Sequence, residues 1–219
     1  YKTFTTQSTG TVYASFILNV TNLGTLNAVG GYFTGFGQNS TTFGATVWTG
    51  LDGTGYKIGI NPRTSTTTNM VWVPETQTLN NNVFIVISYE YVTGSGNDIV
   101  KIWVNPSSST FGTATPPNAS ATVSNISGTD LTGISQFFIR QDSDTETPTI
   151  EMDEYRVGLT WADVTPAATT TPTLTITAPV TGDKWAQGST QTINWTASST
   201  NADLMIEYTG NASDATPTW

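Results

Sequence analysis

The chain contains no cysteine and no histidine. Without these residues it cannot build a Cys/His zinc site, a cysteine nucleophile, a Ser-His-Asp triad or a histidine-ligated haem. Catalysis is then restricted to carboxylate, Tyr, Lys or Arg side chains. A metal site is restricted to oxygen ligands, which suit Ca²⁺ or Mg²⁺.

Positive charge is scarce as well. The sequence has 7 Lys and Arg residues against 16 Asp and Glu residues, which gives a net charge of −9. Nucleic-acid-binding proteins use clusters of Lys and Arg to displace counterions from phosphates, and this sequence contains no such cluster. We therefore expect no nucleic-acid partner. An acidic surface rich in Asn and Thr suits neutral polymers, cations or basic partners.

Long hydrophobic runs are also missing. No run approaches the ~18 apolar residues that a membrane-spanning helix needs, so we expect no membrane insertion. No signal peptide is visible at Tyr1, which indicates a mature chain or a fragment. The 219 residues allow one large β domain and part of a second, and the seven Trp residues supply large buried areas for a core.

The first 166 residues show the two-residue alternation of β-strands and no helical pattern longer than a turn. The strands predicted are 11–20, 32–36, 43–49, 56–60, 70–73, 83–91, 99–104, 134–141 and 150–158. In 43–49, Phe43, Ala45 and Val47 are predicted to share one face and Trp48 the other. The run 83–91 is apolar on both faces, which predicts a central strand. Nine strands separated by turns predict an all-β sandwich or jelly roll.

The composition divides the chain into three parts. Residues 1–166 form the strand-rich domain, and 167–173 read Ala-Ala-Thr-Thr-Thr-Pro-Thr, which is typical of a linker. Residues 174–219 contain three further alternating runs, at 174–176, 192–195 and 204–208. They predict the first half of an Ig-like sandwich, which normally needs ~100 residues, so we expect the native polypeptide to continue past Trp219.

An ordered set of motifs in the first domain resembles a known family. The motifs are Val12–Val20, Gly31-Tyr32-Phe33, Lys57–Ile60, Tyr89-Glu90-Tyr91, Trp103-Val104-Asn105-Pro106, Ile139-Arg140-Gln141, Asp153–Gly158 and Trp161–Val164. They resemble the LamG-like, concanavalin A-like jelly-roll domain of large secreted proteins of Bacteroidetes-type bacteria, which use type IX secretion. Residues 174–208 look like the Ig-like repeats that follow such domains. The resemblance implies fold, compartment and a multidomain parent, but no particular reaction.

An acidic run in the last predicted strand of the first domain invites comparison with glycosidases. Glu151 and Asp153 resemble the start of the Glu-x-Asp-x-Glu or Glu-x-Asp-x-x-Glu signature of laminarinase-type glycoside hydrolases. The second catalytic Glu should stand at position 155 or 156, where this chain has Tyr155 and Arg156. Glu154 is predicted on the opposite face of the strand. We therefore predict no catalytic residues here, and a structural ion pair formed by Asp153, Glu154 and Arg156.

A second acidic segment is a candidate calcium site. Asp142, Asp144 and Glu146 place three carboxylates at alternate positions in a polar loop, and Ca²⁺ takes several such oxygens. The alternative is a solvated acidic loop, because no EF-hand-like Gly or distal Glu follows.

Sugar binding would require exposed aromatic rings with polar neighbours. Four residues near predicted strand ends or loops are the candidates, namely Trp48, Tyr56, Arg63 and Trp72. The alternative for each aromatic residue is core packing. The remaining Trp residues of interest lie within apolar alternation or family motifs and are assigned to the core; they are Trp103, Trp161, Trp185 and Trp195.

These observations predict a non-catalytic accessory module of a larger secreted or cell-surface bacterial protein, which binds a polysaccharide or cell-surface glycan, mediates adhesion or spaces other domains. Its other partners would be further domains of the same polypeptide. Two alternatives remain open. One is a glycan-cleaving enzyme of the laminarinase type that uses Glu151 or Asp153, and the other is a structural subunit of an extracellular filament.

Overall fold

The computed structural model describes residues 1–62, 69–124, 129–141, 143–165 and 173–198. The chain divides into two compact units, Tyr1–Ala168 (unit 1) and Thr169–Trp219 (unit 2). Strands are the main regular structure of the described residues, and they pair in antiparallel sheets. No helix among them is long and apolar enough to span a membrane. Arg63 and Asp142, both candidate site residues, lie outside the described ranges.

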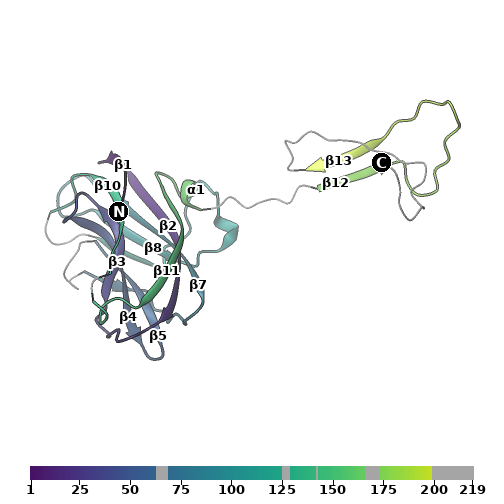
Figure 1. The fold of residues 1–219 in the computed structure, drawn as a ribbon. Helices are drawn as coiled ribbons and strands as arrows, with labels where there is room; N and C mark the ends of the chain where they lie inside the picture. Colours follow the sequence, from purple (N-terminus) through teal and green to yellow (C-terminus); the bar gives the residue numbers. More distant parts are fainter. Residues whose placement is uncertain (63–68, 125–128, 142, 166–172, 199–219) are drawn as a thin grey trace. The chain divides into compact units, whose positions relative to one another are not determined.

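Unit 1 is built from two antiparallel sheets that face each other (Figure 1). The six-stranded sheet has the order β1-β10-β3-β4-β5-β6. Its strands are β1 Lys2–Gln7, β3 Gly31–Gly37, β4 Phe43–Asp52, β5 Gly55–Asn61, β6 Val71–Trp72 and β10 Ile134–Ile139. The five-stranded sheet has the order β11-β2-β7-β8-β9. Its strands are β2 Thr11–Asn22, β7 Asn82–Glu90, β8 Ile99–Val104, β9 Ala121–Ser124 and β11 Thr149–Gly158.

The main core lies between the two sheets. The strand β2 supplies every second residue to it, and its alternating apolar residues Val12, Ala14, Phe16, Leu18 and Val20 are all fully buried. The central position predicted for 83–91 is confirmed, because β7 pairs with β2 on one side and β8 on the other. All nine predicted strands of unit 1 are present, within a few residues of their expected ends.

Two strands of unit 1 escaped the sequence analysis. The strand β1 (Lys-Thr-Phe-Thr-Thr-Gln) has a single large apolar residue, and β9 (Ala-Thr-Val-Ser) lies inside a stretch predicted to be a loop. Both are edge strands or neighbours of an edge. Such strands are ordered mainly by backbone pairing with a partner, which leaves a weak pattern in the sequence.

Two short helices complete unit 1: η1 Ser108–Thr110 and α1 Trp161–Val164. The helix α1 begins at a capping box, in which the Thr160 side chain accepts from the Asp163 backbone N–H and the Asp163 carboxylate accepts from the Thr160 N–H. Trp161 and Val164 of this helix are buried with Val86 and Trp103 in a second apolar cluster, separate from the main core.

The described part of unit 2 contains two antiparallel strands, β12 Thr173–Ala178 and β13 Asn194–Ser198. The core assignment of Trp185 and Trp195 is wrong for this part of the chain, since their exposed fractions are 47% and 41%. A two-stranded sheet cannot enclose a core by itself. The third run predicted in unit 2, 204–208, lies outside the described residues.

Candidate functional site

A row of residues crosses four neighbouring strands of the six-stranded sheet. Tyr32 of β3 pairs with Trp48 of β4, Trp48 pairs with Gly59 of β5, and Gly59 pairs with Trp72 of β6. Directly paired residues in an antiparallel sheet point to the same face. Val47 and Ile58, which directly precede Trp48 and Gly59 in the sequence, point into the main core. Because side chains alternate along a strand, the row lies on the outer face of the sheet.

The indole of Trp72 lies against two glycines of this outer face. A Cβ atom added to Gly59 would stand 2.7 Å from Trp72 Cε3, and one added to Gly50 would stand 2.8 Å from Trp72 Cη2. The two glycines therefore create the room that the ring occupies. Trp72 itself is only half-buried, so the sheet supports one side of the ring and the other side lies toward solvent.

Further rings extend the row toward β10. The ring centroid of Tyr32 lies 5.6 Å from that of Trp48 and 6.1 Å from that of Phe138, and the Phe43 and Phe138 centroids are 4.3 Å apart. We call the five residues Tyr32, Phe43, Trp48, Trp72 and Phe138 the aromatic face. Trp48 and Phe138 are buried within it, while Tyr32, Phe43 and Trp72 are half-buried.

Phe43 joins this face because the alternation of β4 is broken. It was predicted on the side of Ala45 and Val47, and that prediction is wrong. Gly44 and Ala45 both face the interior, and Ala45 has φ 48°, while the pairing with β3 shifts its register in the same place. Such a bulge adds one residue to the strand and reverses the faces on one side of it.

A hydrogen bond fixes the Trp48 ring in this array. Its Nε1 donates to Thr46 Oγ1 at 3.0 Å, two residues earlier on the same face of β4. Trp48 is 6% exposed, so it supports its neighbours more than it offers a surface of its own.

A cation lies over an aromatic ring near each end of the row. Lys57 Nζ is 4.6 Å from the Trp72 ring centroid. Arg140 Cζ is 4.3 Å from the Tyr32 ring centroid, and Arg140 Nη1 donates to Tyr32 Oη. Cations are attracted to the negative face of such rings. The aromatic face therefore combines flat apolar surface with positive charge.

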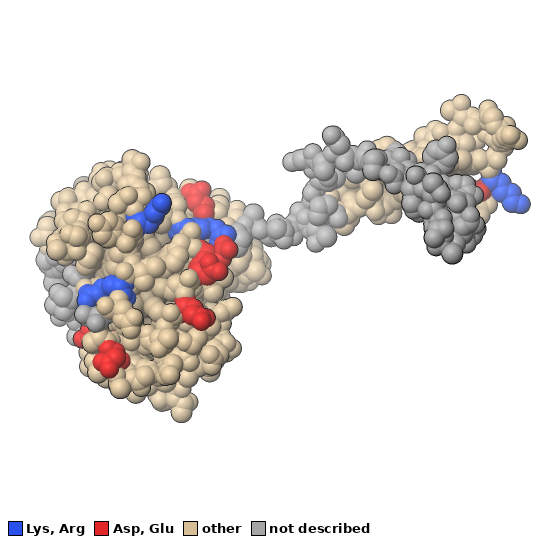
Figure 2. Space-filling model, in the orientation of Figure 1, with Lys and Arg blue, Asp and Glu red and all other residues tan. Residues whose placement is uncertain are grey.

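Elsewhere on unit 1 the charged groups are small and separate. Figure 2 shows acidic and basic side chains as scattered groups on a surface that is mostly uncharged. Lys101 Nζ lies 2.8 Å from Glu90 Oε2, and Arg156 Nη2 lies 2.7 Å from Glu154 Oε2. Both pairs belong to the five-stranded sheet, so these cations are already neutralised by carboxylates.

The candidates predicted for sugar binding have different positions. Trp48 and Trp72 come together in the row described above. Tyr56 is fully buried on the inner face of β5, where burial raises its pKa to about 12. The prediction of Tyr56 as a binding platform is therefore corrected, because β5 alternates and Lys57, not Tyr56, points outward.

The acidic run lies on the other sheet. Glu151 and Asp153 belong to β11, an edge strand of the five-stranded sheet. They pair with Asn19 and Ile17 of β2, whose apolar neighbours face the core, so both carboxylates point outward. Glu151 Oε2 accepts a hydrogen bond from Asn19 Nδ2 at 3.2 Å.

A bulge follows Asp153 and changes the prediction for Glu154. The register shifts between Asp153 and Arg156, and Glu154 has φ 56°. The simple alternation that placed Glu154 on the opposite face therefore does not hold, and its carboxylate pairs with Arg156 at 2.7 Å. Asp153 takes no part in that ion pair; its Oδ1 accepts from the Glu154 backbone N–H at 2.7 Å. The pair is exposed, so it contributes little to stability.

The predicted calcium loop is only partly described. Asp144 is exposed and Glu146 is half-buried in a turn in which the Glu146 and Thr147 N–H groups donate to Ser143 O. Across the described ranges, no group of three or more Asp and Glu residues is arranged to hold a metal ion. With Asp142 outside those ranges, the calcium site stays a prediction.

A buried carboxylate elsewhere has a structural role. Asp98 Oδ2 accepts from Tyr89 Oη and Asp98 Oδ1 from Val92 N, both at 2.7 Å. Burial raises the pKa of Asp98, while these two hydrogen bonds lower it and nearby Asp130 raises it. Tyr89 Oη in turn accepts from Leu131 N at 3.0 Å. The network joins β7, β8 and the loop before β10.

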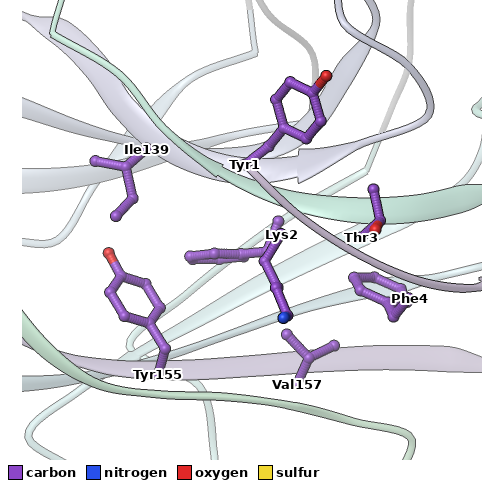
Figure 3. Close-up of a pocket in the computed structure, with 8 residues that line it drawn as sticks. Tyr1, Lys2, Thr3, Phe4, Ile139, Tyr155 and Val157 are labelled. Carbon is purple, nitrogen blue, oxygen red and sulfur yellow. The ribbon is translucent and has the colours of Figure 1, made fainter.

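An apolar groove of about 500 Å³ lies between the two edge strands β1 and β11 (Figure 3). Lys2 and Phe4 line it from β1, and Tyr155 and Val157 line it from β11, with Ile139 at the end of β10. The Tyr155 ring stacks on Phe16 at 5.8 Å, and burial raises its pKa. Tyr155 therefore fills the edge of the core at the position where the glycosidase signature would need a carboxylate.

The aromatic face includes residues that the sequence analysis did not select, namely Tyr32, Phe43, Phe138, Lys57 and Arg140. One signal was available. Tyr32-Phe33 and Phe137-Phe138 are pairs of consecutive aromatic residues in predicted strands, so each pair must direct one ring outward.

Searches with this chain gave no relative: no protein-family model matches it, and no curated protein matches it.

Proposed function

We propose that the aromatic face is a carbohydrate-binding surface, and that the chain is a non-catalytic module that attaches a larger protein to a polysaccharide or cell-surface glycan. The contact of the partly exposed Trp72 ring with Gly50 and Gly59 carries this proposal. A ring whose only role is core packing is enclosed on both sides. Trp72 is supported from below and left half-exposed, which is the arrangement that stacking of a sugar ring requires.

The length of the row suits a short stretch of polymer. It crosses from β3 to β6, three interstrand steps of ~4.8 Å, or about 14 Å. Aromatic residues give large contact areas with little loss of side-chain entropy. The polar tips of Tyr32 Oη and the Arg140 guanidinium beside the row supply hydrogen bonds for sugar hydroxyl groups.

The wider assignment is part of the same proposal. We infer a LamG-like, concanavalin A-like jelly roll in unit 1 and the start of an Ig-like domain in unit 2, in a secreted or surface-attached bacterial protein. The two facing antiparallel sheets of unit 1 and the antiparallel pair β12–β13 of unit 2 support this assignment, together with the ordered motifs of the sequence.

A glycan array followed by titration calorimetry tests the binding function. We expect the chain to bind at least one polysaccharide, and Trp72→Ala to abolish that binding. Thr122→Ala, on the exposed side of edge strand β9, is the matched control and should bind normally. Silence across the array would reject the proposal and leave a spacer or protein-adhesion role.

The enzyme alternative is tested separately. Glu151 and Asp153 lie on β11 of the five-stranded sheet, whereas the aromatic face belongs to the six-stranded sheet, so these carboxylates do not face a sugar bound there. We therefore expect no release of reducing sugar from β-glucans. Release that disappears in Glu151→Gln would establish the enzyme instead.

A further inference from the structure

Lys57 differs from the ion-paired cations of unit 1. Lys101 and Arg156 each contact a carboxylate within 2.8 Å. Lys57 forms no ion pair with any residue in the described part of the chain; its ammonium lies over the Trp72 ring. The acidic residue on the same face of the β4–β5 hairpin is Asp52, whose Oδ2 accepts from Thr76 Oγ1.

The position of Lys57 affects what can stack on Trp72. The backbone at Gly50 and Gly59 contacts the indole, and the Lys57 ammonium lies 4.6 Å from the ring centroid, so a ligand that stacks on Trp72 meets this ammonium. A neutral sugar that stacks there displaces the ammonium and loses its attraction to the ring. A sugar with an acidic substituent retains the ammonium as a charge-assisted partner beside the ring.

The opposite end of the row repeats the arrangement. Arg140 lies over Tyr32 as Lys57 lies over Trp72. Two of the seven basic residues of a chain with net charge −9 are thus placed at the two ends of one aromatic row.

We infer that Lys57 makes the aromatic face selective for acidic glycans, those with carboxylate or sulfate groups, over neutral glycans of the same backbone. This inference rests on the proposed carbohydrate-binding function. Lys57 is the specificity-determining residue, and Trp72 provides the stacking surface for every ligand.

The test compares matched polymers by titration calorimetry at low ionic strength. One pair is polygalacturonate and its fully methyl-esterified form, which differ in carboxylate, and the other is κ-carrageenan and its desulfated form, which differ in sulfate. We expect the wild-type chain to prefer the acidic member of at least one pair about tenfold, the value of one charge-assisted hydrogen bond. The pair that shows the preference identifies carboxylate or sulfate as the recognised group.

Three variants locate the selectivity. Lys57→Gln should reduce the acidic-to-neutral affinity ratio to about one. Lys57→Arg should retain the preference. Lys101→Gln removes the same charge from the ion pair with Glu90 and should leave the ratio unchanged, which separates a local effect from net charge.

Each outcome decides between the two proposals. A wild-type ratio near one, or an unchanged ratio in Lys57→Gln with a normal melting curve, overturns the role of Lys57 while carbohydrate binding stands. If Lys101→Gln loses the selectivity as well, the preference comes from net charge, and the role of Lys57 is overturned in this case too. If the wild-type chain binds none of these polymers but binds another polysaccharide on the array, the role of Lys57 is overturned while carbohydrate binding stands. Silence across the array as well rejects the binding function itself.

Discussion

The outer faces of the two sheets of unit 1 differ in how far other segments of the chain cover them. Part of the outer face of the five-stranded sheet is covered: Val86 and Trp103 pack there with Trp161 and Val164 of α1 in a buried cluster. The outer face of the six-stranded sheet has its own rings, yet Tyr32, Phe43 and Trp72 stay half-exposed on it.

The indole N–H groups show what this difference means. Trp103 Nε1 donates to Pro117 O at 2.9 Å, and Trp161 Nε1 donates to Thr110 O at 2.8 Å. Both polar atoms are satisfied by backbone of the covering segments, as burial requires. Trp72 lies instead on glycine backbone with a lysine above it. One face is partly covered by segments of the chain itself, and the other leaves rings partly exposed.

The largest expected effect separates the two kinds of tryptophan by stability. Trp161→Ala should lower the free energy of unfolding by about 3–5 kcal/mol, because it removes a fully buried ring and its hydrogen bond. Trp72→Ala should lower it by about 1 kcal/mol, since the ring is half-exposed. Urea denaturation of unit 1 measures both. Equal losses would show that Trp72 is a core residue and would remove the contrast between the faces.

The next effect concerns the glycines beneath Trp72. Gly59→Ala places a methyl group where the indole lies and should lift the ring from the sheet, with a loss of glycan affinity of about tenfold, or ~1.4 kcal/mol. Stability should change by less than about 1 kcal/mol, because alanine also restricts the unfolded chain. Calorimetry and denaturation of the same variant report the two quantities. Unchanged affinity would mean that the flat indole is irrelevant to binding.

A smaller effect tests how α1 is held over the five-stranded sheet. Asp163→Ala removes half of the capping box and should destabilise unit 1 by about 1 kcal/mol. Hydrogen bonds from Thr160 hold the pKa of Asp163 below its usual value. This stabilisation is therefore complete above the pKa of the unfolded chain and is lost as the pH falls through the lower, folded pKa. Denaturation at pH 7 and pH 2 should show a difference between variant and wild type only at pH 7.

The smallest effect concerns the exposed edge of the five-stranded sheet. Glu154 has φ 56°, a conformation that costs a non-glycine residue about 1 kcal/mol. Glu154→Gly relieves this cost and loses an exposed ion pair worth less than that, so stability should rise by about 0.5 kcal/mol. Glu154→Gln, which loses the pair alone, is the control. A marked fall in Glu154→Gly would show that the pair with Arg156 holds the bulge.

Much of the fold could be predicted from local patterns. Alternation located nine strands of unit 1, and the doubly apolar run 83–91 correctly became the central strand β7. Strands β1 and β9 could not be predicted in this way, because their residues gain order from a neighbouring strand and carry little pattern of their own. The positions of Phe43 and Glu154 were predicted wrongly for one physical reason: Phe43 precedes a bulge and Glu154 occupies one, and a single extra residue reverses the alternation.

The candidate site was only partly accessible to sequence reasoning. Trp48 and Trp72 were selected as aromatic residues near strand ends, and so was Tyr56, which is buried. The three are separated by 8 and 16 positions along the chain, and residue type alone does not say which of them share a face. The pairing across β4, β5 and β6 decides which of them share a face, and the missing Cβ atoms of Gly50 and Gly59 leave the space that the Trp72 ring occupies.

The sequence by itself determined the all-β class, the central strand and the types of chemistry that are excluded, because composition and two-residue periodicity are local properties. Only the tertiary structure decided which rings form a surface and which form a core. That outcome depends on the register between strands, on bulges that shift it, and on whether a helix or loop covers the sheet. Trp72 and Trp161 are the same residue, and their surroundings give them different roles.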